Sequence, residues 1–204
     1  MNKVYVVDHG VGNTVAIMNL LRKMGYSAEK VKSSSQLSGV DFSKSKFILP
    51  GVGSFDAGMN ALHERGLSKL LVEHGNSGGH ILGICLGMQL LLDSSQEGAV
   101  SGLGIIPGSL VRMTSSAGYR VPHVGWETIE ISKPDAIFAG VSKSRFYHNH
   151  SYALPSPSAF ELASIDYSDR FAVAIRLDNI VGVQFHPEKS HSEGRRIFIN
   201  YLSN

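Results

Sequence analysis

The sequence predicts an α/β fold with a mostly parallel central sheet flanked by helices, and with additional antiparallel strands in the second half. Up to about residue 100, short β-branched runs alternate with segments of helical periodicity, which is typical of parallel strands joined by helices. After about Gly102, short runs that alternate apolar and polar residues follow one another, as antiparallel strands do. Because no repeat or linker divides the two parts, we expect one domain over residues 1–204.

The first half is expected to contain alternating strands and helices. Strands are predicted at residues 3–10, 27–33, 46–55 and 80–87. Helices are predicted at residues 13–24, 55–74 and 86–95. Asn13 or Thr14 can cap the first helix, and Gly25 and Gly75 suit the ends of the first and second helices.

The second half is expected to be mainly strands, separated by turns rich in glycine, proline, serine and aspartate. These strands are predicted at residues 109–115, 127–132, 144–154, 160–167, 171–178 and 179–188. A helix is expected at residues 194–204, with Ile197, Phe198 and Tyr201 facing inward.

Composition narrows the class of protein. The chain has 204 residues and 43% hydrophobic content, which is enough to form a sizeable core. Its formal net charge of +2 is too balanced for a protein that binds nucleic acid, so no nucleic-acid partner is expected. The apolar run Val4–Val7 is followed at once by Asp8, so it is not a signal peptide, and no run is long enough to span a membrane. A single cysteine forms no internal disulfide. We therefore expect a cytoplasmic location and no membrane partner.

That single cysteine stands in the stretch GICLG, where an apolar strand is expected to run directly into an apolar helix. This stretch fits the pattern of a nucleophile elbow, Gly-x-nucleophile-x-Gly, in which x is any residue. Cys85 would then stand at a helix N-terminus, which favours a thiolate, and the Leu86 N–H would face a developing oxyanion. The alternative is a buried cysteine that only fills space, the usual role of a free thiol.

A thiol nucleophile needs a base and a group that orients the base. In VGVQFHPEKS a β-run ends in His186, and Glu188 follows two residues later, on the same face if the backbone stays extended. The alternative is a strand-end histidine and a solvated glutamate.

The stretch LPGVG could complete the site, because glycines allow backbone N–H groups to approach a ligand. A donor from Val52 or Gly53 would complement Leu86. The alternative is an ordinary strand-to-helix turn.

GVGNTV fails the dinucleotide-binding pattern at Val15, and no phosphate-binding loop occurs. HNH at 148–150 lacks a third ligand at a suitable spacing, so no metal and no cofactor are expected.

Together these stretches resemble the class I glutamine amidotransferase family, and within it the glutaminase subunits of imidazole glycerol phosphate synthase. The resemblance runs nearly end to end and is carried by VVDHGVGN, LPGVGSF, GICLGMQLLL, GLGIIPG, VPHVGW, HSY and QFHPEKS.

The resemblance implies that a Cys85–His186–Glu188 triad hydrolyses the side-chain amide of glutamine. It implies an oxyanion hole formed by Gly51, Val52, Gly53 and Leu86, and glutamine-binding residues Gln89, Glu97, Ser151 and Tyr152. It also implies a (β/α)₈ cyclase partner that receives the ammonia in histidine biosynthesis, with Asn13, Trp126 and Lys189 as candidate interface or gating residues.

Three positions depart from the subfamily pattern. Glu127 stands where asparagine is usual, FYHNHSY replaces a Tyr-Phe-Val-His-type run, and DHG replaces Asp-Tyr-Gly. Two alternatives therefore stay open. One is a paralogous glutaminase that feeds a sugar amidotransferase in surface-polysaccharide biosynthesis, and the other is a cysteine hydrolase of different specificity.

Overall fold

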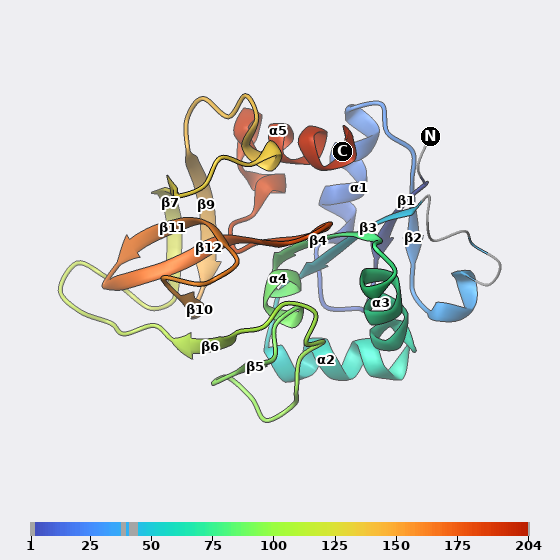
Figure 1. Cartoon of the computed structure of the whole chain (residues 1–204), viewed down its shortest axis with the longest axis horizontal. Helices are drawn as coiled ribbons and strands as arrows, with labels where there is room; N and C mark the ends of the chain where they lie inside the picture. The colour runs from blue at the N-terminus through green and yellow to red at the C-terminus, as the bar shows by residue number, and fades with distance from the viewer. Residues whose placement is uncertain (1–2, 38–39, 41–44, 204) are drawn as a thin grey trace.

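The computed structural model, which describes residues 3–37, 40 and 45–203, is built around one mixed sheet (Figure 1). The strands follow the order β2-β1-β3-β4-β13-β12-β10-β6-β5, and β11 pairs with β12 and with β8. The five strands from β2 to β13 are parallel, whereas β12, β10 and β6 continue the sheet by antiparallel pairing. The predicted fold class is therefore confirmed.

The strands have the following bounds: β1 Lys3–Val7, β2 Ala28–Val31, β3 Ser45–Gly51, β4 His80–Cys85, β5 Ser94–Ser95, β6 Ser109–Arg112, β7 His123–Thr128, β8 Glu130–Ile131, β9 Arg145–His150, β10 Tyr152–Pro155, β11 Glu161–Tyr167, β12 Asp169–Leu177 and β13 Ile180–Val183. The helices are α1 Thr14–Lys23, α2 Phe55–Glu64, α3 Leu67–Asn76, α4 Leu86–Leu90 and α5 His191–Ser203. Short 3₁₀ turns lie at η1 Ser34–Leu37, η3 Ala136–Phe138 and η4 Pro187–Lys189. None of the helices in the described part of the chain is long and apolar enough to cross a membrane.

Strand alternation divides the core between the two faces of the sheet. In β1, Val4 and Val6 pack in one cluster with α1 and α5, whereas Tyr5 and Val7 pack in the other with α2, α3 and α4. Successive side chains of a strand point to opposite faces, so this apolar run needs helices on both sides. Figure 1 shows α1 and α5 above the sheet and α2 and α3 below it.

The predicted helix at residues 55–74 is wrong as a single element. Gly66 adopts a left-handed conformation, with φ of 65°, and divides the segment into α2 and α3. Glycine adopts this conformation without a Cβ clash, so the chain can turn sharply there. The second of these two helices, α3, continues past the expected stop at Gly75 and ends at Asn76.

Other boundaries also differ from the prediction. The strand expected at residues 127–132 is the end of β7 followed by the separate strand β8, and the strand expected at residues 179–188 ends at Val183. The helix after Cys85 is only five residues long, Leu86–Leu90. Residues 144–154 form two strands, because β9 pairs with β7 while β10 pairs with β12 and β6. The final helix begins at His191, earlier than expected, and buries Ile197, Phe198 and Tyr201 as predicted. The N-terminal cap of α1 is Asn13, whose side chain accepts a hydrogen bond from the Ala16 N–H.

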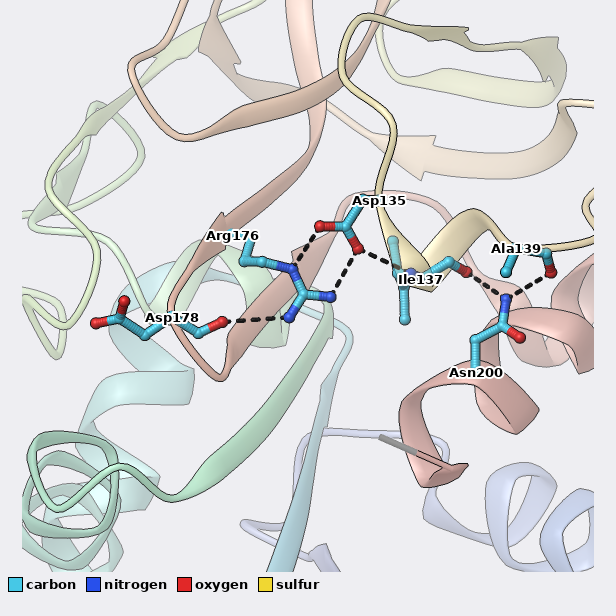
Figure 2. A network of polar contacts seen from close by, with 6 residues as sticks. All are labelled: Asp135, Ile137, Ala139, Arg176, Asp178 and Asn200. Atoms are coloured by element: carbon cyan, nitrogen blue, oxygen red, sulfur yellow. Dashed lines mark hydrogen bonds and ion pairs between the residues drawn. The ribbon is translucent and has the colours of Figure 1, made fainter.

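Polar contacts fix α5 and the neighbouring turn η3 against the sheet (Figure 2). The Arg176 guanidinium on β12 binds both oxygens of Asp135 at 2.7 Å, and Asp135 also accepts from the N–H of Ile137 in η3. Asn200 of α5 donates to the carbonyl oxygens of Ile137 and Ala139. These bonds satisfy groups that the chain buries between β12 and α5.

Candidate active site

Cys85 stands at the sharp turn where β4 passes directly into α4. Its backbone has φ of 54° and ψ of −111°, a conformation that costs a non-glycine residue about 1–3 kcal/mol. The side chain is only 5% exposed. A strained residue that the surrounding structure holds in place at a strand-to-helix turn is the geometry of a nucleophile elbow.

The glycines beside Cys85 are required by close packing. A Cβ on Gly83 would lie 2.7 Å from the Gly87 carbonyl oxygen and 2.8 Å from the Met88 nitrogen. A Cβ on Gly87 would collide with the carbonyl oxygen of Leu49 in β3. The pattern of glycines around the cysteine is therefore set by the tight turn, as the sequence indicates.

His186 and Glu188 form a buried pair immediately after β13. Nδ1 of His186 lies 2.8 Å from Oε1 of Glu188, and their side chains are 2% and 3% exposed. The backbone between them is a 3₁₀ turn, η4, so the expectation of an extended chain is wrong although the contact itself is present. Because Glu188 holds Nδ1, Nε2 of His186 is the ring nitrogen available to exchange a proton with Cys85 or with a substrate.

The charge state of His186 is set by competing effects. Burial lowers the pKa of the imidazole, but the interactions with Cys85 and Glu188, through hydrogen bonding and through their negative charges, outweigh it and raise the pKa to about 9. His186 is therefore protonated at neutral pH when Cys85 is a thiolate. An imidazolium beside a thiolate is the charge arrangement of an activated cysteine nucleophile.

Two further groups contact the sulfur. Sγ of Cys85 lies 3.7 Å from the carbonyl oxygen of Asn149 in β9, to which the thiol can donate. Nε2 of Gln184 donates to the sulfur at 3.7 Å, and its Oε1 accepts from Nε2 of Gln89 at 3.0 Å. Gln184 is fully buried, so this side chain fixes the sulfur relative to Gln89.

The turn at residues 51–53, which is predicted to bind an oxyanion, is only partly aligned for that role. Gly51 pairs with Cys85 in the β3–β4 ladder, and Leu86 is the first residue of α4, so its N–H has no partner within the helix. The Val52 N–H, however, donates to the carbonyl oxygen of Val11 at 3.3 Å. This amide cannot serve an oxyanion until that bond breaks. Gly53 has φ of 117°, a conformation open to glycine.

A cavity of about 290 Å³ opens beside Cys85 and collects the predicted substrate residues. Its lining includes Val52, Gly53, Cys85, Leu86, Gln89, Glu97, Ser151 and Tyr152. These residues are scattered along the sequence, and the structure brings them to one cavity.

The two predicted glutamine-binding residues with the clearest contacts are Gln89 and Glu97. Nε2 of Gln89 also donates to the Tyr152 carbonyl oxygen at 3.1 Å. Oε2 of Glu97 accepts from the N–H of Phe55 at 2.8 Å, at the start of α2. Glu97 therefore caps a helix and lines the cavity with the same carboxylate.

Four residues at the site were not predicted from the sequence. Pro122, Asn149 and His150 line the cavity, and Gln184 contacts the sulfur. Gln184 lies two residues before His186, and that proximity is the one signal in the sequence that could have identified it. The other three depend on how the strands pair, which the sequence alone does not determine.

The predicted interface residues lie on neighbouring elements. The Trp126 ring stacks on His191 with centroids 5.1 Å apart, and Nζ of Lys189 lies 5.3 Å from the centre of the Tyr147 ring. Asn13 caps α1, which contacts η4, the turn that carries Lys189. Trp126 is 36% exposed, so a tryptophan is presented to solvent here.

The chain belongs to the class I glutamine amidotransferase family, whose pattern, Glutamine amidotransferase class-I, matches residues 5–203. Within that family its full-length relatives carry the name imidazole glycerol phosphate synthase subunit HisH. The chain is 39% identical over 202 residues to HisH 2 of Pseudomonas aeruginosa, covering 98% of each chain. It is 38% identical over 203 residues to HisH 2 of Methanococcus maripaludis, covering 97% of each chain.

A third relative is longer. The chloroplastic imidazole glycerol phosphate synthase hisHF of Arabidopsis thaliana is 39% identical over 203 residues, which are 98% of this chain and 34% of that protein.

Solved structures agree on the fold. A putative GMP synthase component from Thermoplasma acidophilum superposes with a TM-score of 0.72 at 26% identity, covering 100% of this chain and 93% of that chain. PurLQS from Thermotoga maritima superposes with a TM-score of 0.74 at 19% identity, covering 100% of this chain and 99% of that chain, a likeness of fold alone.

Proposed function

We propose that this chain, acting as one domain, is a glutaminase that releases ammonia from glutamine for imidazole glycerol phosphate synthesis in histidine biosynthesis. The observation that carries the proposal is the strained Cys85 beside a cavity, with the buried His186–Glu188 pair coupled to its sulfur. The names of the full-length relatives support this substrate and pathway.

In the proposed reaction the Cys85 thiolate attacks the side-chain amide carbon of glutamine. The His186 imidazolium gives its Nε2 proton to the leaving nitrogen, the C–N bond breaks and ammonia departs, which leaves a thioester on Cys85. The neutral imidazole then removes a proton from water, whose oxygen attacks the thioester and displaces the sulfur. Glu188 holds Nδ1 of His186 and stabilises its positive charge throughout.

The oxyanion of each tetrahedral intermediate would be bound by the Leu86 N–H and by amides of the turn from Gly51 to Gly53. Because the Val52 N–H is held by Val11 in the resting structure, full activity requires that turn to change conformation. Removing one such donor typically lowers the rate by about 10²–10³-fold, so the resting enzyme is expected to be slow.

The product explains why a partner is expected. In water at neutral pH free ammonia is mostly ammonium, which is not a nucleophile, so the ammonia must pass to its acceptor without escaping. A (β/α)₈ cyclase subunit docked over the site as a heterodimer would provide that passage. The Arabidopsis relative supports the idea, because two thirds of that chain lies outside the matched segment.

Exposed apolar side chains, one of which lines the cavity, offer such a partner a surface. Val15 of α1 is 61% exposed, Val52 of the oxyanion turn 39% and Trp126 36%. A partner that covered Val52 could also reorient the turn that carries it. A cytoplasmic location for the complex stays a prediction.

The test uses the Cys85→Ala variant together with the cyclase subunit of imidazole glycerol phosphate synthase. Glutamine-dependent synthesis should disappear, whereas synthesis from added ammonium salts should continue at the rate of the unaltered complex. If the ammonium-dependent reaction also disappeared, the proposed division of labour between the two subunits would be wrong.

A further inference from the structure

We propose that His123, His148 and His150 form a binding site for a divalent transition metal ion of the zinc type, made of residues other than the Cys85, His186 and Glu188 side chains. The three imidazoles meet on the buried face of the β7–β9 pair. Each offers a ring nitrogen, and these three atoms all lie within 4.8 Å of one another. Imidazole nitrogen is a preferred ligand of Zn²⁺, and three such ligands with one open position make a recognised coordination set.

The strand register explains how the three residues meet. His123 at the start of β7 pairs directly with His150 at the end of β9, and His148 is two residues before His150. Residues two apart in a strand share a face, so His148 and His150 point the same way. Ring centroids are separated by 4.9 Å, 5.2 Å and 5.6 Å in the three pairings. The third ligand that spacing could not supply therefore comes from the neighbouring strand.

The ring nitrogens of this cluster lack the partners that buried polar atoms normally have. His148 is 0% exposed and neither of its ring nitrogens makes a hydrogen bond with the described residues. The same holds for Nδ1 of His123 and for Nε2 of His150, which is 6% exposed. Burying polar atoms without partners is unfavourable, and a bound cation would satisfy several of them at once.

His150 also has the second contact that a metal-binding histidine needs. Its Nδ1 lies 3.0 Å from the carbonyl oxygen of Tyr152, to which it can donate, and this fixes the tautomer with Nε2 as the free ligand atom. Histidine ligands characteristically donate their other ring N–H to a backbone carbonyl or a carboxylate in this way.

The geometry fits zinc after a small adjustment. Bonds of about 2.0–2.1 Å in a tetrahedral site place ligand nitrogens about 3.3 Å apart, so the separations must shorten by up to about 1.5 Å. The χ2 angle of histidine is soft, so ring rotation can provide this. Tyr167 stacks on His123 with centroids 3.9 Å apart, and Phe185 contacts the edge of His148, so aromatic rings surround the site.

The site would brace the strand that supports the catalytic residues. The β9 carbonyl oxygen of Tyr147 accepts from the His186 N–H at 2.8 Å, and the carbonyl oxygen of Asn149 contacts Sγ of Cys85. His148 and His150 alternate with these two residues along the same strand. A metal bound by His148 and His150 would therefore hold the stretch of β9 backbone whose carbonyl oxygens contact the Cys85 sulfur and the His186 backbone N–H.

The experiment must separate this site from Cys85 and His186, which could themselves take up zinc. The metal-free Cys85→Ala protein is titrated with Zn²⁺ and, in parallel, with Co²⁺. We expect one equivalent of either metal to bind, the visible absorption of tetrahedral Co²⁺ without a thiolate charge-transfer band, and a melting temperature that rises with metal concentration.

The matched variants carry one further change in the same background. His148→Phe keeps an aromatic ring but removes a ligand, and should weaken zinc binding about 100-fold or more, whereas His63→Gln on α2 should bind as tightly as the parent. If His148→Phe fails to fold, His123→Gln serves the same purpose. If neither variant folds, the Co²⁺ spectrum of the Cys85→Ala protein shows whether a tetrahedral site without a thiolate is present. Absence of metal uptake by the Cys85→Ala protein, or equal uptake by His148→Phe, would overturn the proposal.

Discussion

His186 Nδ1 lies 2.8 Å from Oε1 of Glu188, and the pair is buried beside the sulfur of Cys85. This contact orients the imidazole and, together with Cys85, determines its charge. Burial by itself lowers the pKa of His186, so the raised value of about 9 depends on its hydrogen bonds and on the two neighbouring negative charges. The protonated imidazole is the form that can give a proton to the departing ammonia.

The first prediction concerns the alkaline limb of glutamine hydrolysis. Activity should fall as pH rises through about 9, because His186 then loses the proton that the leaving group needs. Glu188→Gln removes one of the charges that raise this pKa, so the limb should move to lower pH and kcat should fall. The measurement is kcat/KM against pH for both proteins. An alkaline limb at the same pH in the variant would contradict the role given to Glu188.

The second prediction concerns Gln184, which only the structure identifies. Gln184→Met keeps the length of the side chain but removes the donor to Sγ and the acceptor for Gln89. Loss of one such hydrogen bond is worth about 1 kcal/mol, so kcat should fall about fivefold. Steady-state kinetics with glutamine tests this, with the melting temperature as the control for folding. An unchanged kcat in a stable variant would show that the contact between Gln184 and the sulfur does not affect the reaction rate.

The third prediction separates two roles of Glu97. Glu97→Gln keeps an oxygen that can accept from the Phe55 N–H, but removes the negative charge that faces the cavity. If the carboxylate binds the positively charged amino group of glutamine, KM should rise about tenfold with little change in kcat, which corresponds to about 1.4 kcal/mol. A normal KM accompanied by a lower melting temperature would mean that Glu97 serves only to cap α2.

The fourth prediction tests the polar network of Figure 2. Arg176→Met removes both bonds to Asp135, whose carboxylate is largely buried. Hydrogen bonds to charged groups contribute about 1.5–3 kcal/mol, so the free energy of unfolding should fall by about 2 kcal/mol. For a chain of this size the melting temperature should drop by about 4–8 °C. Arg195→Met, an exposed change on α5, should leave the melting temperature nearly unchanged.

The sequence was sufficient to predict the elements that depend on local chemistry. The glycines of GICLG predict the tight turn, because only glycine fits beside Leu49 and Met88. The apolar runs of β3 and β4 predict that these strands are buried. The helix break at Gly66 was missed because isolated glycines also occur inside helices, as Gly58 does in α2.

The features that could not be predicted depend on pairing between distant strands. Residues 144–154 read as one strand, but β9 and β10 pair with different partners, and this split brings Asn149 to the sulfur. The same pairing places His123 beside His150. These residues are so far apart in the sequence that no ligand-spacing pattern could have indicated their contact. The contact between His186 and Glu188 was predicted correctly, although a 3₁₀ turn forms it rather than an extended strand.

The most direct test of the proposed function is the rate of glutamine hydrolysis by the purified chain alone, and then with the imidazole glycerol phosphate synthase cyclase and its nucleotide ligand. Because the Val52 N–H is bound to Val11, we expect slow hydrolysis alone and a rise of about 10²-fold or more with the liganded partner, absent in Cys85→Ala. Hydrolysis that is indifferent to the cyclase would move the chain to a surface-polysaccharide or free-standing role. Hydrolysis in neither case would contradict the assignment of Cys85 as the nucleophile of a glutaminase.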